Sequence, residues 1–431
     1  MIKKSAGLVI IKENRILLIK PKGIESDNHW SIPKGYIEDT DANIIETALR
    51  ETFEETGINI PIDIVDISKR SIISYTDNNG KLRKIIFYFV VKITEEEYKN
   101  YKKVEVLDNL EVEKISFLDL REAKKKIYFK QLSVLNHIKE GSFNLDDLNN
   151  NIKLGYINKK KHPKFPIWIY NITSKCKKEL YWNYTTLSCR GLILDESGKI
   201  IARPFQKFFE SQQVYNEIRM LLPTEKIRYE KLDGALGILY WFKNQPYITS
   251  KNNFDHALGQ IATTLLYNDY LTTTSIPRDT TLLFEIISDK NSFTIIYNQK
   301  KIVLIGSINI FSGKNVSIKN EINFNTPKVI DNNEIIRDYK NVEGGVEIFA
   351  DNTRIKIKTE YFNKRYIELK KLKEAIVIEN NYKNVTLNFI EKDYIEHFKS
   401  KLFLFLFNLY LNNESNKEWD KFVKSNFIYW I

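Results

Sequence analysis

The sequence is poor in cysteine, which cross-links small secreted domains through disulfides, and in glycine and proline, which interrupt regular secondary structure. It has 2 cysteines in 431 residues, Cys176 and Cys189, too few for a disulfide scaffold or a four-cysteine zinc site. They lie thirteen positions apart with no pair of histidines nearby, so we interpret both as reduced thiols. With only 16 glycines and 10 prolines, the chain is neither collagen-like nor largely disordered.

Long hydrophobic runs are missing too. The apolar run Ala6–Ile11 is too short for the core of a signal peptide, and charged residues follow it at once. The longest run, Leu402–Leu411, is interrupted by Asn408 and has about half of the ~20 residues that span a bilayer. We therefore expect a cytoplasmic protein with no membrane partner.

What the chain has in quantity is length, apolar residues and positive charge. Its 431 residues predict two or three domains at roughly 150 residues each, and 43% hydrophobic residues suffice for globular cores. The 66 Lys and Arg residues outnumber the 55 Asp and Glu residues, which leaves a net charge of +11. A surface of this sign favours polyanions such as nucleic acid or nucleotides.

The first part of the chain shows alternating strand and helix signals. Two short apolar runs flank Glu13–Asn14 and indicate a β-hairpin. Apolar residues at helical spacing predict a helix between Asp41 and Thr56, with Thr40 or Asp41 as its N-cap and Gly57 at its end. This mixture of elements predicts the α+β class.

Changes in the pattern predict the domain boundaries. Strands over Ile73–Tyr75 and Lys84–Ile93 and a final helix over Leu118–Ile138 complete one α/β unit. A stretch with few apolar residues and three consecutive asparagines follows, then many strand-like segments, and helical spacing returns near the end. We therefore expect a first domain at 1–140, a linker at 141–158, a second domain at 159–362 and a helical appendage at 363–431.

Three carboxylates share one face of the first predicted helix. Glu51, Glu54 and Glu55 stand at positions i, i+3 and i+4. A cation among them would offset their mutual repulsion, and hard oxygen ligands suit Mg²⁺ or Mn²⁺. Such a metal would neutralise phosphate charge and orient a water molecule for attack on phosphorus. Taken alone, the pattern also fits a solvated acidic helix face.

The residues around these glutamates resemble the Nudix box, the motif of hydrolases that cleave nucleoside diphosphates linked to another moiety. The resemblance extends over roughly residues 1–140 and implies an α/β/α sandwich. It also implies that Arg50 orients the carboxylates, that Glu54 is catalytic, and that the three glutamates hold Mg²⁺ or Mn²⁺. The matching segments are Pro33–Glu38, Arg50–Glu51, Glu54–Glu55 and Gly57–Ile58.

The box departs from the family pattern in one loop. Gly35 lies fifteen residues before Arg50, one more than the usual spacing, and the acidic residue after the glycine is Asp41 rather than glutamate. Because the extra residue precedes the helix, we expect the glutamates to keep their register and metal binding to persist. The segment from Trp30 to Gly35 is similar to diadenosine tetraphosphate hydrolases and RNA 5′-pyrophosphohydrolases. Trp30 and Tyr36 are then candidates either for stacking on adenine or for packing inside the domain.

A second chemical pattern is the lysine of a Lys-x-Asp-Gly tetrapeptide, Lys231–Gly234. It resembles the nucleotide-accepting motif of covalent nucleotidyltransferases, the ligases and capping enzymes that use ATP or GTP. In that chemistry the lysine amine attacks the α-phosphate, pyrophosphate leaves, and a lysine–AMP phosphoramidate remains. An ordinary lysine has a pKa near 10.4, so neighbouring cations, a metal or burial must make Lys231 neutral before it attacks.

Further segments of the chain are similar to the other motifs of these nucleotidyltransferases and follow one another in the same order as in that family. They extend the resemblance over about 170 residues. It implies that Glu285 holds the ribose hydroxyls and that Glu343 binds a metal. Lys356 and Lys358 alternate on one strand, so they share a face and would grip the α-phosphate; an exposed sheet face is the alternative for these two lysines alone. The implied nucleotide-binding residues are Arg190, Lys207, Glu230, Asp233, Gly234, Lys251, Glu285, Lys356 and Lys358.

The segment Arg203–Phe209 is similar to the phage-type RNA ligases of the tRNA-repair group. Only 73 residues follow Lys358, and their helical spacing argues against the oligonucleotide-binding barrel of DNA ligases and capping enzymes. The resemblance therefore implies a nucleotidyltransferase domain of ATP-grasp-like antiparallel sheets, with Lys231 as nucleophile, ATP as cofactor and RNA, tRNA included, as partner.

The resulting hypothesis is a bifunctional RNA-processing enzyme. A Mg²⁺-dependent Nudix pyrophosphohydrolase, acting on a nucleoside diphosphate linkage, is joined to a ligase that connects 5′-phosphate and 3′-hydroxyl RNA ends through lysyl-AMP and adenylylated RNA. Two alternatives stay open: an RNA-capping guanylyltransferase fused to the Nudix domain, and a non-catalytic RNA-binding protein with two decayed enzyme folds. Decay usually removes nucleophiles and metal ligands first, yet Lys231, Glu343, Glu54 and Glu55 are all present.

Overall fold

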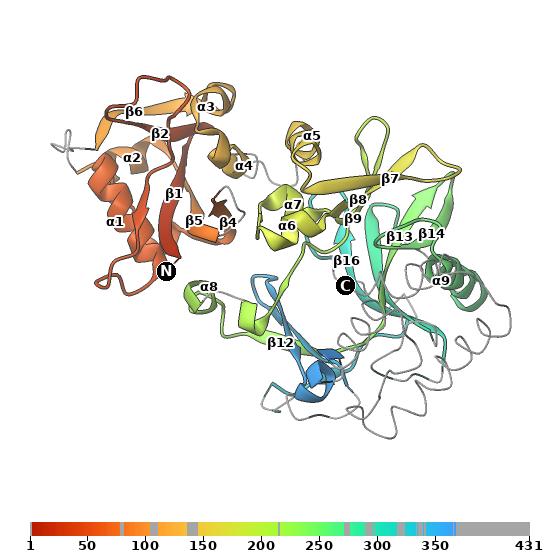
Figure 1. Ribbon diagram of the computed structural model, residues 1–431. Coiled ribbons are helices and arrows are strands. Elements are labelled where there is room, and N and C mark those ends of the chain that lie inside the picture. The colour runs from red at the N-terminus through yellow and green to blue at the C-terminus, as the bar shows by residue number, and fades with distance from the viewer. Residues whose placement is uncertain are drawn as a thin grey trace, which may run out of the picture.

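The structure of the protein, a computed structural model, contains one sheet flanked by helices followed by three further sheets (Figure 1). The α+β multidomain class expected from the sequence is confirmed. The helical appendage expected at 363–431 lies almost wholly outside the described residues. These are 2–77, 82–103, 111–135, 145–213, 216–270, 276–288, 295, 297, 299–316, 324–332, 334, 339, 342–364, 366 and 367.

The first part of the chain is a mixed sheet with helices on both faces, as the α/β/α expectation requires. Its strands lie in the order β4-β5-β1-β2-β6, with β3 also paired to β1, and β1 runs parallel to β5. One face packs on α1 and the other on α3 and α4. The elements are β1 (Lys3–Lys12), β2 (Arg15–Pro21), β3 (Lys34–Tyr36), α1 (Ile44–Thr56), β4 (Asp66–Thr76), β5 (Leu82–Ile93), α2 (Glu95–Tyr101), β6 (Val112–Asp119), α3 (Leu120–Lys126) and α4 (Leu132–Leu135).

The predicted hairpin is present between β1 and β2. Its turn residues Glu13 and Asn14 both have positive φ, 46° and 70°, a geometry that suits a tight turn between twisted strands. Ile11 pairs with Ile16 across the turn. Because β1 lies in the middle of the sheet, its apolar run is buried on both faces.

Helix α1 begins a few residues later than the sequence predicts. Asn43 caps it, because its side-chain oxygen accepts hydrogen bonds from two backbone N–H groups of the first turn. The prediction that Thr40 or Asp41 caps the helix is therefore wrong. Gly57 ends the helix with φ 72°, in the left-handed region, as expected.

The single helix predicted over Leu118–Ile138 is wrong in its continuity, because α3 and α4 are separate. At Ile127 the chain is extended and pairs with a distant segment. The N–H of Trp30 donates to the carbonyl of Lys126, and the N–H of Tyr128 donates to the carbonyl of Trp30. These long-range hydrogen bonds replace helical ones, which periodicity along the chain cannot reveal.

Part of the segment predicted as a linker, 141–158, is folded. Helix α5 (Leu145–Lys153) lies within it, and strand β7 (Ile157–Lys161) starts at its end. Leu148 belongs to a buried apolar cluster, and the buried Asp147 accepts a hydrogen bond from a threonine hydroxyl. This part of the segment differs from the prediction because its polar residues have protein partners.

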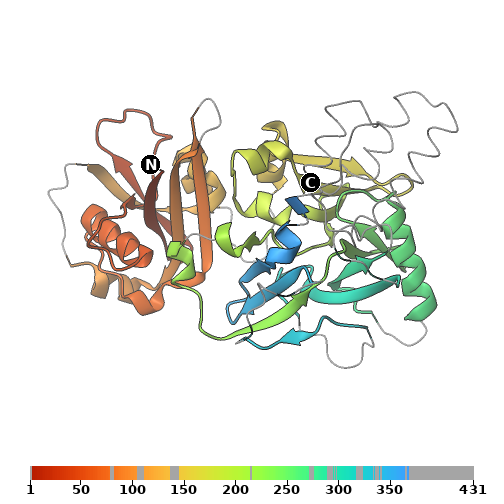
Figure 2. The ribbon, with the colours of Figure 1, turned by 60° about the horizontal axis from the view of Figure 1, so that its bottom comes forward.

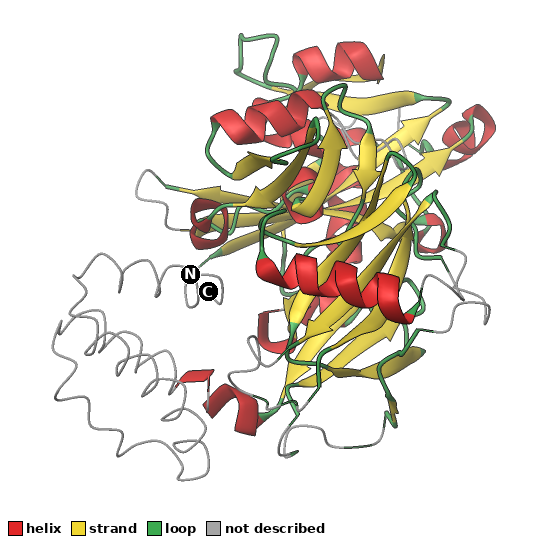
Figure 3. Cartoon of the chain, turned by 90° about the vertical axis from the view of Figure 1, so that its right-hand side faces the viewer, coloured by secondary structure: helices red, strands yellow, loops and turns green. Residues whose placement is uncertain are grey.

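The second part of the chain consists of three mainly antiparallel sheets, as expected. Their strand orders are β10-β9-β8-β7, β11-β19-β18-β12-β17 and β14-β13-β15-β16. Helix α9 covers one face of the last sheet (Figure 3), and the β7–β10 sheet packs against its other face. The elements are β8 (Ile167–Ile172), α6 (Ser174–Lys178), α7 (Tyr184–Ser188), β9 (Arg190–Asp195), β10 (Ile200–Ala202), β11 (Phe209–Glu210), α8 (Asn216–Arg219), β12 (Lys226–Lys231), β13 (Ala235–Phe242), β14 (Gln245–Ser250), α9 (Ala257–Asp269), β15 (Thr280–Ile287), β16 (Lys301–Asn309), β17 (Val329–Ile330), β18 (Gly344–Phe349) and β19 (Arg354–Lys358).

The two parts of the chain share a hydrophobic contact at α8, which lies against the first sheet (Figure 2). Ile218 is 5% exposed and belongs to the same apolar cluster as the buried side chains of α1. Beside it, Glu217 forms an ion pair of 2.5 Å with Lys4 of β1. A second contact joins Arg70 of β4 to the hydroxyl of Thr353, at 2.7 Å, in the turn between β18 and β19. The sheet that contains β12, β18 and β19 is therefore attached to the first sheet at two points.

We expect Ile218→Asp to destabilise the protein by roughly 3 kcal/mol or more, because it removes apolar contacts and places a carboxylate in an apolar cluster. Thermal unfolding of the full chain, followed by calorimetry, measures the effect. Met220→Asp is the matched control, since Met220 is 69% exposed two residues further on. Equal melting temperatures for the two variants would contradict the packing of α8 on the first sheet.

The helices of the described residues are short. The longest, α1 and α9, have 13 residues each. None has both the length and the apolar character needed to cross a lipid bilayer. The apolar run Leu402–Leu411 lies outside the described residues.

Candidate active sites

Arg50 organises the first candidate site, on helix α1. It donates hydrogen bonds to the carboxylates of Glu51 at 2.9 Å and Glu54 at 3.1 Å. It also donates two hydrogen bonds of 3.0 Å to Asp41 and one of 2.9 Å to the carbonyl of Tyr36. One planar guanidinium thus connects the acidic face of the helix to the loop that precedes it.

Asp41 shows how the box accommodates its extra loop residue. Besides Arg50, its carboxylate accepts hydrogen bonds from the hydroxyl of Thr47 at 2.8 Å and from the N–H of Glu38 at 2.9 Å. The hydrogen bonds from Arg50 are the largest cause that lowers the pKa of Asp41 to about 2. The longer loop therefore folds back and anchors Arg50. Sequence reasoning considered Asp41 as a helix cap and as a departure from the box, but not as a partner of Arg50, although an acidic residue ahead of a helical arginine was an available signal.

Glu51 and Glu55 face strand β3 and are largely buried. The carboxylate of Glu55 accepts a hydrogen bond of 2.7 Å from the N–H of Lys34. A Cβ atom at Gly35 would lie 1.9 Å from the carboxyl group of Glu51, so a larger residue at this position would displace that carboxyl group. Burial raises the pKa of both carboxyls, that of Glu55 to about 7.

The three glutamates are a suitable donor set for a divalent cation. Mg²⁺ and Mn²⁺ prefer carboxylate oxygens, and the raised pKa values of Glu51 and Glu55 mark buried carboxyls whose ionised form a cation would stabilise. Among the described residues, no group of three histidine, cysteine, aspartate or glutamate side chains is gathered closely enough to hold a metal. Metal binding at α1 therefore requires rearrangement of these side chains and of Arg50, which contacts two of them.

The two aromatic residues near the box lie in different environments. Trp30 is 2% exposed in the apolar cluster beneath α3, and its Nε1 donates to Asp27 at 3.3 Å, so it is a packing residue. Tyr36 is 47% exposed. The amines of Lys84 and Lys3 lie 4.4 and 5.3 Å from its ring centroid. Of the two aromatic side chains only Tyr36 is exposed, so it alone stays a candidate for stacking on a base.

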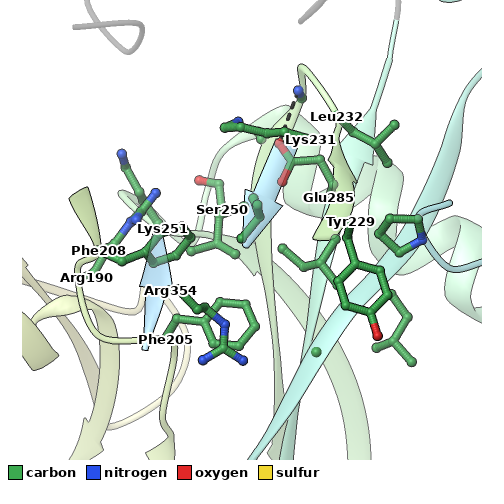
Figure 4. A pocket seen from close by; sticks show the side chains of 18 of the residues that line it. Arg190, Phe205, Phe208, Tyr229, Lys231, Leu232, Ser250, Lys251, Glu285 and Arg354 are labelled. Atoms are coloured by element: carbon green, nitrogen blue, oxygen red, sulfur yellow. Dashed lines mark hydrogen bonds between the residues drawn. The ribbon is translucent and has the colours of Figure 1, made fainter. Parts of the chain in front are cut away.

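The second candidate site is a cavity of about 810 Å³ between two sheets (Figure 4). One wall belongs to β12, β18 and β19, and the facing wall to β13, β14, β15 and β16. Its volume and its mixture of apolar and charged side chains are typical of small-molecule sites. The predicted site residues that line it are Arg190, Glu230, Lys231, Gly234, Lys251, Glu285 and Lys356.

Lys231 lies at the end of β12, with its amine directed at a buried carboxylate. Its Nζ is 2.5 Å from Oε2 of Glu343, and the two side chains are 18% and 7% exposed. Burial lowers the pKa of this amine, but Glu343 and the nearby Glu285 outweigh burial and hold the pKa above its ordinary value. Lys231 is therefore an ammonium group in this state and must lose its proton before it can act as a nucleophile.

The turn after Lys231 is held by hydrogen bonds to neighbouring elements. The N–H of Gly234 donates to Oε1 of Glu285 at 3.1 Å. The N–H of Asp233 donates to the hydroxyl of Tyr297 at 2.9 Å, and its carboxylate accepts from the N–H of Ile295 at 3.0 Å. Burial is the largest cause that raises the pKa of Asp233 and of Glu285 to about 7. Glu285 faces the cavity, whereas Asp233 stabilises the turn.

Three further basic side chains line the cavity. They are Arg190 on β9, Lys251 just after β14 and Lys356 on β19. Burial lowers the pKa of all three, to about 7 for Lys251 and about 6 for Lys356, and Arg190 lowers the pKa of both lysines further. The ring of Phe208 lies 4.5 Å from the Lys356 amine and 5.7 Å from the Arg190 guanidinium. Such a group of cations suits a chain of phosphates.

Family models match both parts of the chain. Residues 1–137 match the NUDIX domain, and residues 188–391 match the RNA ligase family. The chain belongs to the Nudix family through its first domain, and its second part matches the RNA ligase family. It is an enzyme with a Nudix hydrolase domain and an RNA ligase domain in one polypeptide.

Relatives of the Nudix domain include a mammalian enzyme and a phage protein. The chain is 32% identical over 140 residues to bis(5′-nucleosyl)-tetraphosphatase of Rattus norvegicus. The aligned residues make up 31% of this chain and 89% of the relative. A 17.7 kDa protein of Enterobacteria phage T4 is 26% identical over 112 residues, 24% of this chain and 70% of the relative.

Solved structures similar to the Nudix domain include an Ap4A hydrolase of C. elegans in a binary complex. It is 24% identical, covers 32% of this chain and 94% of that chain, and has a TM-score of 0.25. The MutT NUDIX hydrolase of Burkholderia pseudomallei is 18% identical, covers 32% of this chain and 99% of that chain, and has a TM-score of 0.26.

Some predicted residues of the ligase domain lie beside the cavity rather than on its lining. Lys358 forms an ion pair of 2.7 Å with Glu210 and must leave it to reach a bound phosphate. The Lys207 amine lies 4.6 Å from the ring centroid of Phe209, and burial lowers its pKa to about 8. The predicted residues outside the lining are Lys207, Asp233, Glu343 and Lys358.

Sequence reasoning missed Tyr229 and Arg354, which line the cavity of the ligase domain. Each stands two positions before a predicted residue on the same strand, Tyr229 before Lys231 and Arg354 before Lys356. Side chains at i and i+2 of a strand share a face, so alternation along β12 and β19 was a signal that could have found them. Phe208 also lines the cavity.

Proposed function

We propose that the ligase domain is an ATP-dependent RNA ligase that joins a 5′-phosphate end to a 3′-hydroxyl end through lysyl-AMP at Lys231. The observation that carries this proposal is the position of Lys231 and Glu285 on the lining of a nucleotide-sized cavity that Arg190, Lys251 and Lys356 also line (Figure 4). The match to the RNA ligase family and the net charge of +11 support RNA as the polymer. Resemblance to the tRNA-repair group makes cleaved tRNA the first RNA to test.

The proposed reaction consists of three transfers at phosphorus. Nζ of Lys231 attacks the α-phosphorus of ATP, so that a P–N bond forms as the bond to the leaving pyrophosphate breaks. An oxygen of the RNA 5′-phosphate then attacks the same phosphorus and releases the lysine. The RNA 3′-hydroxyl finally attacks the 5′-phosphorus, and AMP leaves. In this proposal Lys251 and Lys356, which line the cavity, stabilise negative charge on the phosphates, and Glu285 accepts hydrogen bonds from the ribose.

Glu343 has two roles in this proposal. It is the metal ligand implied for the ligase domain, and a divalent cation, when bound, supplies charge neutralisation to the phosphates. Its carboxylate also stabilises the proton on Lys231. The charge of Glu343 is the largest cause that raises the pKa of Lys231. When the two side chains separate, the pKa of the amine falls and it can lose its proton.

Labelling of the pure protein with ATP or GTP carrying a labelled α-phosphate tests this function. With Mg²⁺ present we expect covalent AMP on the protein, and joining of a 5′-phosphate RNA to a 3′-hydroxyl RNA. Label from GTP alone would favour the guanylyltransferase alternative. The absence of label from both nucleotides would contradict the proposal and favour a binding protein.

We expect ATP binding to take up protons at mildly alkaline pH. In the free protein the lowered pKa values of Lys251 and Lys356, about 7 and about 6, make both amines mostly neutral at about pH 8. A bound triphosphate favours their ammonium forms, so affinity should fall as pH rises through this range. Calorimetry with a non-hydrolysable ATP analogue in buffers of different ionisation enthalpy measures the uptake. The variant Lys356→Met should take up fewer protons, and zero uptake by the wild type would contradict the prediction.

We infer that the Nudix domain is a Mg²⁺-dependent pyrophosphohydrolase for nucleotides joined through a chain of phosphates. The three glutamates of α1 are the residues that would hold the metal, and Arg50 positions two of them. A relative 32% identical is named a bis(5′-nucleosyl)-tetraphosphatase, which supports this substrate class. Two sources of such linkages concern a ligase: RNA with a 5′-triphosphate or a stalled 5′-AMP, and dinucleoside polyphosphates formed when a nucleotide accepts AMP from the lysine.

A substrate panel distinguishes these two sources. The wild type and Glu54→Gln receive RNA with a 5′-triphosphate, a 5′-adenylyl group or a 5′-monophosphate, and separately diadenosine tetraphosphate. Hydrolysis of the RNA ends, with impaired joining of triphosphate RNA by Glu54→Gln, supports a role in preparing ends. Hydrolysis confined to the dinucleotide, with normal joining by Glu54→Gln, excludes that role and supports clearance of by-products. No hydrolysis of any of these substrates contradicts the assigned substrate class.

A further inference from the structure

Two strands that carry lysines of the ligase cavity begin at the contact with the Nudix domain. Strand β12, which ends at Lys231, follows α8, and α8 packs on the Nudix sheet (Figure 1). Strand β19, which carries Lys356, follows the turn that contacts Arg70 of β4. The N–H of Ala350 in this turn donates to the carbonyl of Glu225, just before β12, at 3.0 Å, so the starts of the two strands are joined. One wall of the cavity is therefore anchored on the Nudix domain.

The turn between β18 and β19 has a defined structure, and Arg70 binds its side chains. The N–H of Phe349 donates to the carbonyl of Thr353 at 2.9 Å, and Asn352 has positive φ, 64°, as in many tight turns between strands. The carboxylate of Asp351 accepts hydrogen bonds from the N–H of Thr353 at 2.9 Å and from its hydroxyl at 2.7 Å. Arg70 donates to the same hydroxyl at 2.7 Å and forms an ion pair of 3.5 Å with Asp351. One guanidinium thus contacts both side chains that shape the turn.

The contact of Arg70 with the turn is largely buried. Its side chain is 16% exposed and that of Asp351 is 13% exposed. Burial lowers the pKa of Arg70, and the charge of Asp351 is the largest cause that opposes this effect. Exposed ion pairs contribute little to structure, whereas removal of one partner from a buried pair has a large effect. Arg70 therefore fixes the turn relative to the Nudix sheet.

The position of the turn affects where Lys356 lies in the cavity. Lys356 follows Thr353 by three residues, which corresponds to about 10 Å along a strand. On one side β19 pairs with β18 through all five of its residues, and on the other side only with the two-residue strand β11. Because so short a strand moves as a unit, a displaced turn displaces Lys356 as well. Misplacement of a reacting group by about 1 Å is enough to lower a rate a hundredfold.

We propose that the Nudix domain has a second, non-catalytic role, in which Arg70 is a positioning residue for the ligase reaction. Arg70 acts through Asp351 and Thr353 on the turn, and through the turn on Lys356, which in the proposed reaction stabilises charge on the phosphates of ATP. The proposal rests on the ATP-dependent ligase function given above. It does not involve the glutamates of α1, so each site keeps its own chemistry while the ligase wall depends on the Nudix fold.

Single-turnover adenylylation of the full-length protein tests the role of Arg70. The amplitude of lysyl-AMP formation counts the molecules with a folded ligase site, and the rate constant at saturating ATP reports how well the reacting groups are placed. We expect Arg70→Met to lower this rate constant roughly tenfold to a hundredfold and to keep the wild-type amplitude. Hydrolysis of diadenosine tetraphosphate should stay at the wild-type rate. Arg70→Lys keeps a positive charge and a donor, so it should restore part of the rate.

A double-mutant cycle identifies the turn as the route of this effect. Thr353→Val removes the hydroxyl that accepts the hydrogen bond from Arg70 and keeps the shape of the side chain, so it should slow adenylylation too. Because both changes break the same contact, Arg70→Met should cause little further loss in the Thr353→Val background. Arg83→Met is the matched control, since Arg83 is an arginine of β5 in the Nudix domain that is 60% exposed and pairs with Asp77.

Three results would overturn the proposal. The first is a wild-type rate constant in Arg70→Met with only a reduced amplitude, because a contact that merely stabilises the fold behaves in this way. The second is full additivity of Arg70→Met and Thr353→Val, and the third is equal slowing by Arg83→Met. Failure of the ligase function is seen separately, as absence of lysyl-AMP in wild-type protein.

Discussion

Replacement of Lys231 by alanine or by arginine is expected to abolish covalent labelling of the protein by ATP. The amine of Lys231 is the nucleophile of the proposed reaction, and loss of a nucleophile costs at least about a thousandfold in rate. The alanine variant leaves Glu343 buried without its ion-pair partner, so instability could explain its result. The arginine variant keeps a positive charge beside Glu343 but has no nucleophilic amine. Loss of labelling in both variants therefore reports on chemistry.

The measurement is transfer of labelled AMP to the protein, detected on a denaturing gel. Lys159→Ala is the matched control, because Lys159 is an exposed lysine of β7 in the same domain. Both Lys231 variants should keep the hydrolase activity of the Nudix domain, because its proposed site lies on α1. Full labelling of Lys231→Ala would refute the assignment of the nucleophile.

Glu54→Gln and Glu55→Gln are expected to stop hydrolysis by the Nudix domain and to leave lysyl-AMP formation intact. Glutamine has the shape of glutamate but lacks the charge that holds a divalent cation. The loss should be roughly a hundredfold to a thousandfold, equivalent to about 3–4 kcal/mol of lost charge stabilisation in the transition state. In Glu55→Gln the side-chain oxygen can still accept the hydrogen bond from the N–H of Lys34, so the loop before α1 should keep its position.

Hydrolysis of diadenosine tetraphosphate and adenylylation by ATP are measured on the same preparations. Glu46→Gln provides the control, since Glu46 is an acidic residue of the first turn of α1, away from the three glutamates. The reciprocal variants Glu285→Ala and Glu343→Ala should impair ligation and spare hydrolysis. If either set removed both activities while the melting temperature stayed unchanged, the two sites would not be independent.

Local sequence was sufficient to predict the elements that carry the chemistry. The glutamates of α1 stand at i, i+3 and i+4, and helical geometry alone places them on one side of the helix. The hairpin at Glu13–Asn14 follows from apolar runs on either side of two turn residues. Lys231 was identified from its tetrapeptide and from the order of the segments around it. For the helix and the hairpin the determining residues lie close together in the chain, and for Lys231 the order of segments along the chain added to its tetrapeptide.

Contacts between distant segments decided what the sequence could not show. Asp41 became the partner of Arg50 instead of a helix cap because the longer loop folds back on α1. Pairing with Trp30 interrupted the helix predicted over Leu118–Ile138. Ile218, in a short helix of the ligase domain, packs in the apolar cluster of the Nudix domain.

The ligase cavity shows the same division between local and tertiary information. The sequence alone determined that Lys356 and Lys358 share a strand face, because side chains alternate along any strand. Only the tertiary structure decided that Lys356 faces the cavity, that Lys358 pairs with Glu210, and that Arg354 lies over Phe205. The physical reason is that burial and ion pairing depend on which surfaces of distant strands come together, and no periodicity within one strand encodes its neighbours.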